Sequence, residues 1–279
     1  MDIDLRRGLV AEGLGTFAIV YFSAGVVCIN HLTTPGPGPA AAPLHGQQPG
    51  LVGISLAYGL ITAATLAVTI RLSGGFLNPA ITLMLWVFNR LDNKRTAAFL
   101  LVQLGAALLA GACVRYTFDA DVLRDARLGT PHISMAAFRS IDFATIVAGT
   151  SAELVLTFFL VFAIFGMHRE REDPSRVALP AGLVLVAGSL MLYPLTGAAA
   201  NPARWFGTVL WELSLPERLG NPWADTFVYL AGPILGALGA GLVTFRYFLA
   251  GPPPDAIGGP VYPVSAPTNK PTGVTAKRK

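Results

Sequence analysis

Two copies of the tripeptide Asn-Pro-Ala are the clearest chemical feature of this chain. They are formed by Asn78, Pro79 and Ala80 and by Asn201, Pro202 and Ala203. Asn is a favoured N-cap and Pro is favoured at the first helical position, so each tripeptide predicts the start of a helix. A capping Asn uses its side-chain oxygen on the helix backbone, which leaves its NH2 group free to donate a hydrogen bond. The motifs therefore indicate two donors suited to a neutral molecule with an acceptor oxygen.

The chain around these motifs is strongly apolar. Of its 279 residues, 53% are hydrophobic and 13% are charged, whereas a soluble domain carries about 25% charged residues. Six apolar runs approach the roughly 20 residues that a hydrocarbon core of about 30 Å requires. These runs cover residues 8–30, 50–70, 96–117, 143–167, 177–194 and 224–250. Two shorter segments, 78–88 and 201–213, begin at the Asn-Pro-Ala motifs, so we expect an integral membrane protein with six spanning helices and two half-helices.

The two halves of the chain form a repeat, over about residues 8–117 and 143–250. Early in each half, "AEGLGTF" resembles "AELVLTF", which places Glu12 and Glu153 at equivalent positions. Each half contains three spans, so the second half enters the membrane from the opposite side, and functional groups of such repeats gather near the midplane. The half-helices then point their positive ends at the centre, where they repel a cation. The predicted fold is all-α, with six transmembrane helices plus two re-entrant half-helices in an inverted 3+3 repeat.

Four stretches carry a resemblance to a known family. They are "SGGFLNPAITL", "TGAAANPARWFG", the doubled "AExxxTF" and "AGPILGALGAG". On these the chain resembles the aquaporin or major intrinsic protein family over about residues 8–250. The resemblance implies a passive pore that conducts water, and also small neutral solutes such as glycerol or urea, while excluding ions and protons. It also implies a homotetramer with one pore per subunit.

The resemblance further implies a narrow outer selectivity filter. Its members match Tyr58, Ser189, Ala198 and Arg204 of this chain. Strict water channels of the family typically have His where this chain has Ser189, and glycerol channels typically have a second aromatic residue where it has Ala198. A wider opening that admits small solutes is therefore expected. Trp205 stands where glycerol channels usually carry Asp, so glycerol selectivity stays open.

Three further charged residues need an explanation inside the membrane region. Glu12 and Glu153 are intramembrane carboxylates, and two interpretations are open. As symmetry-related acids they accept hydrogen bonds from the re-entrant loops, which the resemblance also implies, or they form a proton relay. The repeat favours the first. Arg71 is expected in the cytoplasmic vestibule, where it either tethers a loop or adds an electrostatic screen.

The topology follows from the charges outside the spans. Lys and Arg are more numerous on the side of both termini, which predicts that both termini are cytoplasmic. Residues 1–250 are expected to form a single transmembrane channel domain, and residues 251–279 a Pro-rich, disordered cytoplasmic tail. The chain contains no Asn-x-Ser/Thr site, which is compatible with the cell membrane, for a bacterium the inner membrane. The basic residues lie at span ends, so no nucleic-acid partner is expected.

The remaining candidates for chemistry are the four histidines. His31, His45, His132 and His168 all fall in predicted loops without metal-ligand spacing, and are interpreted as solvated residues, with His168 a candidate pH gate. No metal, cofactor or enzymatic activity is expected.

Two alternatives to a passive channel remain. A proton-coupled transporter would use Glu12, Glu153 and Arg71, and replacing Glu12 with Gln would abolish coupling but leave folding intact. A structural membrane protein with a closed pore would show negligible permeability.

Overall fold

The computed structural model describes residues 3–32, 48–166, 174–216, 221 and 223–248. Helices are the only regular secondary structure in this part of the chain. They are α1 (Ile3–Leu32), α2 (Gly50–Thr69), α3 (Pro79–Val87), α4 (Asn93–Thr117), α5 (Ala120–Asp125), η1 (Arg127–Gly129), α6 (Phe143–Gly166), α7 (Pro174–Thr196), α8 (Pro202–Glu212), α9 (Thr226–Val243) and η2 (Thr244–Phe248). The predicted tail, residues 251–279, lies outside the described residues.

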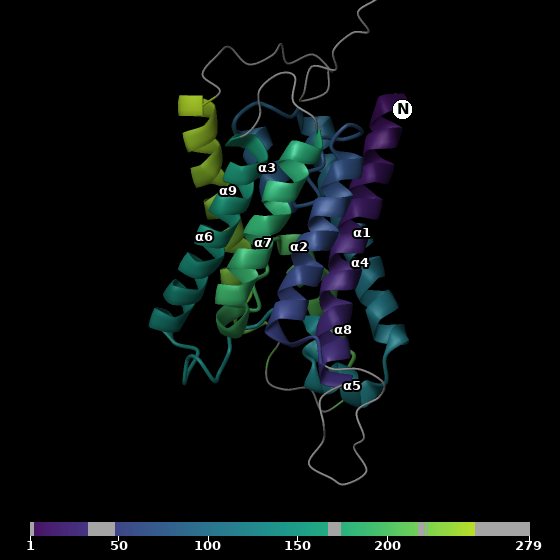
Figure 1. The fold of residues 1–279 in the computed structure, drawn as a ribbon, viewed down its shortest axis with the longest axis vertical. Coiled ribbons are helices and arrows are strands. Elements are labelled where there is room, and N and C mark those ends of the chain that lie inside the picture. The colour runs from purple at the N-terminus through teal and green to yellow at the C-terminus, as the bar shows by residue number, and fades with distance from the viewer. Residues whose placement is uncertain (1–2, 33–47, 167–173, 217–220, 222, 249–279) are drawn as a thin grey trace, which may run out of the picture.

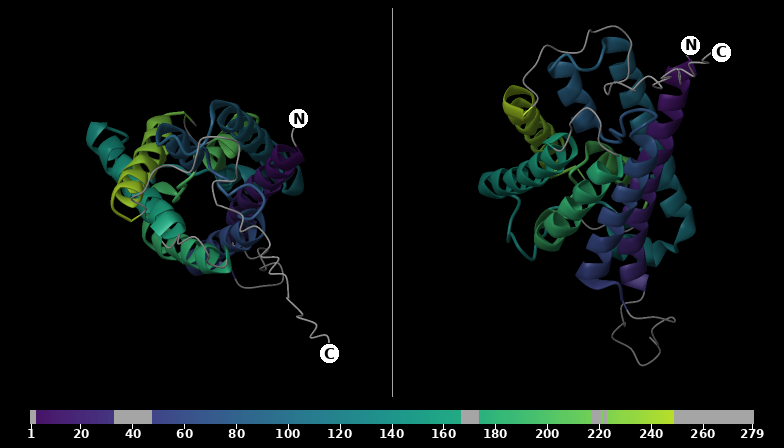
Figure 2. Two further views of the ribbon diagram at one scale, coloured as in Figure 1. Left: turned by 90° about the horizontal axis from the view of Figure 1, so that it is seen from above. Right: turned by 45° about the horizontal axis from the view of Figure 1, so that its top comes forward.

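Six helices of the described chain are long and apolar enough to cross a membrane. They are Asp4–Leu32, Gly50–Thr69, Asn93–Thr117, Phe143–Gly166, Arg176–Thr196 and Thr226–Tyr247. Each corresponds to one of the six predicted runs, and the last continues from α9 into the π-helical turn η2. Figure 2 shows these long helices arranged as a ring when the molecule is seen from above. The predicted six-span, all-helical fold is confirmed.

The two half-helices, α3 and α8, begin at the prolines of the Asn-Pro-Ala motifs. Asn78 caps α3 by accepting a hydrogen bond from the amide of Ala80, and Asn201 caps α8 in the same way from Ala203. The two caps have nearly identical extended φ angles, −155° and −154°. In Figure 1, α3 lies in the upper half of the molecule and α8 in the lower half. The half-helices therefore reach the centre from opposite ends, as the inverted repeat predicts.

Packing between helices repeats the internal symmetry. Within the halves, α1 packs on α2 and α4, and α6 packs on α7 and α9. Between the halves, α2 packs on α7, α3 on α9, and α8 on α4. Each half-helix thus contacts the last spanning helix of the other repeat. This exchange brings the two capped N-termini together in the middle of the fold.

Small residues permit the closest of these helix contacts. A Cβ atom on Gly236 of α9 would overlap the Leu154 carbonyl of α6 and lie 3.0 Å from the Phe158 amide. Backbone atoms cannot move aside as a flexible side chain can. A Cβ atom on Gly105 of α4, by contrast, would meet no atom within 4 Å.

We expect Gly236→Ala to lower the free energy of unfolding by about 1–3 kcal/mol, because the added methyl group forces α6 and α9 apart. The matched control is Gly105→Ala, which adds the same atom in open space and should leave stability unchanged or slightly higher. Thermal unfolding of the detergent-solubilised protein, followed by tryptophan fluorescence, measures both. Equal melting temperatures for the two variants would contradict the close packing of α6 on α9.

Candidate functional site

The loops that precede the two half-helices have matching backbone conformations. Leu77 and Ala200, each directly before its Asn, adopt positive φ angles of 51° and 52°. This left-handed region is unfavourable for residues with a Cβ atom and costs on the order of 1–3 kcal/mol when it is enforced. The surrounding structure must therefore hold both residues in place.

The two buried carboxylates supply the hydrogen bonds that do so. Glu12 accepts from the amides of Phe76 (2.9 Å) and Leu77 (2.6 Å) and from the hydroxyl of Ser73 (2.6 Å). Glu153 makes the equivalent set in the other half. It accepts from Ala199 (2.9 Å), Ala200 (2.7 Å) and the Thr196 hydroxyl (2.7 Å). Both carboxylates are completely buried.

The left-handed conformation turns each carbonyl towards the opposite motif. Asn78 donates from Nδ2 to the Ala200 carbonyl (2.8 Å), and Asn201 donates to the Leu77 carbonyl (2.9 Å). One hydrogen of each NH2 group therefore binds the opposite loop, a contact that the sequence analysis did not predict. An amide NH2 carries two hydrogens, so each Asn keeps a second one for another acceptor.

Gln103 of α4 joins this network, and sequence reasoning missed it. Its Nε2 donates to Glu12 (2.8 Å) and to the hydroxyl of Thr82 (2.9 Å), and Thr82 also donates to the Asn78 carbonyl (3.2 Å). The signal was present, because Gln103 is an uncharged polar residue inside an apolar run. In the other half a different residue fixes the loop, since Tyr229 of α9 donates to the Thr196 carbonyl (2.7 Å).

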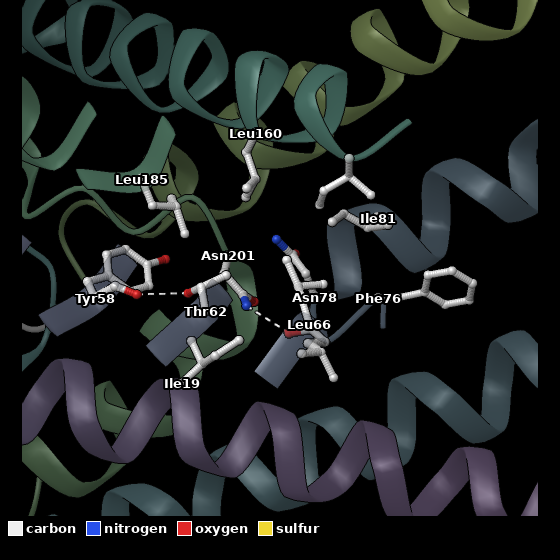
Figure 3. A pocket seen from close by; sticks show the side chains of 12 residues that line it. Ile19, Tyr58, Thr62, Leu66, Phe76, Asn78, Ile81, Leu160, Leu185 and Asn201 are labelled. Atoms are coloured by element: carbon white, nitrogen blue, oxygen red, sulfur yellow. Dashed lines mark hydrogen bonds between the residues drawn. The ribbon is translucent and has the colours of Figure 1, made fainter. Parts of the chain in front are cut away.

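A narrow cavity lies where the half-helices meet. The cavity has a volume of about 20 Å³, which exceeds the roughly 10–15 Å³ that one water molecule needs. Its polar lining comes from Tyr58, Thr62, Asn78 and Asn201, and the rest of the wall is Leu, Ile and Phe. Figure 3 shows the two Asn side chains in the middle of this cavity, with Tyr58 on one side and Ile81 on the other.

Two of the predicted filter residues are brought together beside the cavity. The Arg204 guanidinium lies 4.9 Å from the centre of the Tyr58 ring. Arg204 is held by donation from Nε to Ser23 Oγ (3.0 Å) and from Nη1 to the Gly197 carbonyl (3.3 Å). The Tyr58 hydroxyl donates to the Ala199 carbonyl (2.5 Å). Tyr58 thus lines the cavity, and Arg204 packs against the Tyr58 ring without lining the cavity itself.

The other predicted filter residues are buried but do not line the cavity. Ala198 has a positive φ of 47° in the loop before Asn201. The Ser189 hydroxyl is buried and has no hydrogen-bond partner among the described residues. Trp205 is also buried and stacks on Tyr229, with ring centres 5.9 Å apart. Arg71, predicted for the vestibule, is exposed in the turn that follows α2.

The interpretation of His132 as a solvated loop residue is wrong. Only 7% of its side chain is exposed, and it bridges Glu212 and Asp225. The sequence carries no periodic signal for this, because the three residues come from a loop and two helix ends. His31 is exposed at the end of α1, whereas His45 and His168 lie outside the described residues.

We expect Glu12→Gln and Glu153→Gln each to lower the free energy of unfolding by at least about 2 kcal/mol. Each Gln turns an NH2 group towards buried donors, and an unsatisfied donor costs about 1–3 kcal/mol. Asp119→Asn, at an exposed acid that makes no side-chain capping bond, is the control. Thermal unfolding in detergent compares the stability of all three variants with that of wild type. A Glu12→Gln protein as stable as wild type would instead support the proton-relay interpretation.

The comparisons with known proteins agree with this geometry. The family model "Major intrinsic protein" matches residues 1–244. "Aquaporin TIP4-4" of Zea mays is 32% identical, with 89% of each chain covered. "Lens fiber major intrinsic protein" of Gallus gallus is 34% identical, covering 85% of this chain and 79% of that protein.

A solved structure supports the fold independently of close sequence similarity. The X-ray structure of the aquaglyceroporin from Plasmodium falciparum superposes with a TM-score of 0.70 at 20% identity, covering 88% of this chain and 97% of that one. The family model spans most of the chain and includes both capped half-helices. This chain is therefore a member of the major intrinsic protein family, an integral membrane channel protein.

Proposed function

We propose that this protein is a passive channel for water that also admits small neutral solutes. The observation that carries the proposal is the pair of Asn amides at the meeting point of the half-helices, in a cavity whose wall is otherwise mostly apolar. Each amide has one hydrogen committed to the opposite loop and one left. A water molecule passing this point can accept from these donors, while the apolar wall offers few competing partners.

Charge selectivity has two sources in this arrangement. The N-terminal ends of α3 and α8 carry partial positive charge from their backbone dipoles, and both point to the centre. Arg204 adds a full positive charge next to Tyr58, which lines the cavity. A cation would have to lose its hydration shell next to these groups, so water passes and cations, including hydronium, are excluded.

A proton-coupled transporter is less compatible with the contacts. Glu12 and Glu153 are each occupied by three or more donors from the re-entrant loops and their neighbours. Neither is among the residues that line the cavity. A relay group needs access to the path of the proton, whereas these carboxylates are enclosed by the backbone that they hold.

Membership of the family supports three further proposals. The protein assembles as a homotetramer with one pore in each subunit. It resides in the cell membrane, with both termini in the cytoplasm, since the basic residues favour that side. The site residues of the channel are the two Asn-Pro-Ala motifs and the filter of Tyr58, Ser189, Ala198 and Arg204, with Arg71 in the cytoplasmic vestibule.

The first test is stopped-flow light scattering on proteoliposomes, which records water efflux and the entry of glycerol and urea. We expect wild type to conduct water and solute, and Ala198→Phe to lose solute conduction selectively by about tenfold or more, since the proposed filter includes this position and an added ring would narrow it. Ala97→Phe, an exposed position on α4, is the size-matched control and should behave as wild type. Absence of any water flux would favour the closed, structural alternative.

Tyr58 gives a second test of the filter. Its hydroxyl donates to the Ala199 carbonyl and so takes one of the two acceptor positions of that oxygen, which leaves fewer for a permeating hydroxyl group. We expect Tyr58→Phe to raise the ratio of glycerol to water permeability severalfold, because the ring remains while that acceptor position becomes available. The same stopped-flow assay measures the ratio. A lower ratio than wild type would mean that the Tyr58 hydroxyl itself binds the solute.

A further inference from the structure

A buried polar cluster lies outside the cavity, where the loop between α4 and α6 meets the ends of α8 and α9. His132 Nε2 lies 2.7 Å from Glu212 Oε2, and its Nδ1 lies 3.2 Å from Asp225 Oδ2. Arg127 donates from Nε to the other oxygen of Glu212 (2.8 Å). The Ile133 amide donates to Asp225 (2.8 Å). Only 1% and 2% of the Glu212 and Asp225 side chains are exposed.

The charges of this cluster balance only when His132 is protonated. Glu212 from α8 and Asp225 from the N-cap of α9 contribute two negative charges, and Arg127 from η1 contributes one positive charge. The Tyr229 hydroxyl of α9 is turned away, to the Thr196 carbonyl. Burial by itself lowers the pKa of His132, but the hydrogen bonds to Asp225 and Glu212 outweigh burial and raise it above its usual value.

The cluster holds the strap, the segment of residues 127–133. Near the middle of the strap, a Cβ atom on Gly129 would lie 2.6 Å from the Cα atom of Ala24 in α1. Two residues further on, the Cα atom of Pro131 would lie 2.8 Å from a Cβ atom on Gly197. The backbone of the strap therefore lies directly on α1 and on the loop before α8, with no side chain between.

The two contact points of the strap lie at or next to the two residues that accept hydrogen bonds from Arg204. Ser23, the neighbour of Ala24, accepts from Arg204 Nε at 3.0 Å. Gly197 itself accepts from Arg204 Nη1 through its carbonyl at 3.3 Å. A displacement of the strap would thus remove the backbone that packs on Gly197 and beside Ser23, the two residues that fix the guanidinium.

We propose that His132 is a positioning residue of the outer filter, which clamps the strap to Glu212 and Asp225 and thereby fixes Arg204. This rests on the proposed channel function. The sign of the pH effect follows from the charges. Because the folded pKa of His132 is raised, the stabilisation is present at acidic pH and is lost as the pH rises through that raised pKa. Deprotonation leaves an unbalanced buried carboxylate and loosens the strap.

The test measures water and glycerol permeability of proteoliposomes with equal pH on both sides, from mildly acidic to alkaline, for wild type, His132→Gln and His31→Gln. In wild type we expect the glycerol-to-water ratio to rise by about fivefold with pH, the lower end of typical coupling between sites. His132→Gln should show the high ratio at every pH. His31→Gln, an exposed histidine in α1, should follow wild type.

Several outcomes would overturn the proposal. One is a wild-type glycerol-to-water permeability ratio that does not change with pH. This outcome rejects the proposal even if His132→Gln fails to fold. Another is a His132→Gln protein with the same ratio and pH profile as wild type. A third is loss of the pH response in His31→Gln, which would show that the response depends on His31 and not on His132 alone.

Hydrogen–deuterium exchange separates this inference from the proposed function, because it needs no permeability. The amides of Ile133 and Ser134 donate to Asp225 and to the Leu195 carbonyl. At a single mildly acidic pD, both should exchange about fivefold faster or more in His132→Gln than in wild type or His31→Gln. Faster exchange without water conduction would reject the channel and keep the clamp. Water conduction with unchanged exchange would reject the clamp alone.

Discussion

The structure depends on the hydrogen bonds between two buried carboxylates and two irregular loops. Leu77 and Ala200 each direct their amide to a glutamate and their carbonyl to the opposite asparagine. An irregular backbone at membrane depth is tolerated only when its polar groups are satisfied within the protein. Each carboxylate therefore stabilises an otherwise unfavourable conformation, and the same conformation brings the two half-helices into contact.

Under the proposed function, the arrangement lets polar groups line a path without a carboxylate in the lining of the cavity. The acids that hold the loops are buried behind the backbone, so the groups left for a permeating molecule are mainly amide donors and carbonyl acceptors. Arg204 is held by a serine hydroxyl and a carbonyl, both neutral. None of the ion pairs formed by the described residues involves Arg204, so under the proposed function its positive charge is available to oppose a cation.

Much of this architecture could be predicted from the sequence because its causes are local. Runs of apolar residues predict spans, and the Asn and Pro of each Asn-Pro-Ala motif favour a helix start. Gln103 and His132 could not be placed, since their partners are set by how helices distant in sequence pack. The Tyr58 hydroxyl is a similar case, because its bond to Ala199 depends on the distance between α2 and the loop before α8.

The exchange of half-helices between the repeats has a consequence for the order of folding. α3 packs on two spanning helices, α4 of its own repeat and α9, the last span of the chain. During synthesis from the N-terminus, every other span is inserted before α9 exists. Until the final span arrives and closes the bundle, the first re-entrant loop and α3 are therefore held only by contacts within the first repeat, from Glu12, Gln103 and α4. Formation of the native cavity is thus a late, long-range step, which is slow for contacts of such high sequence separation.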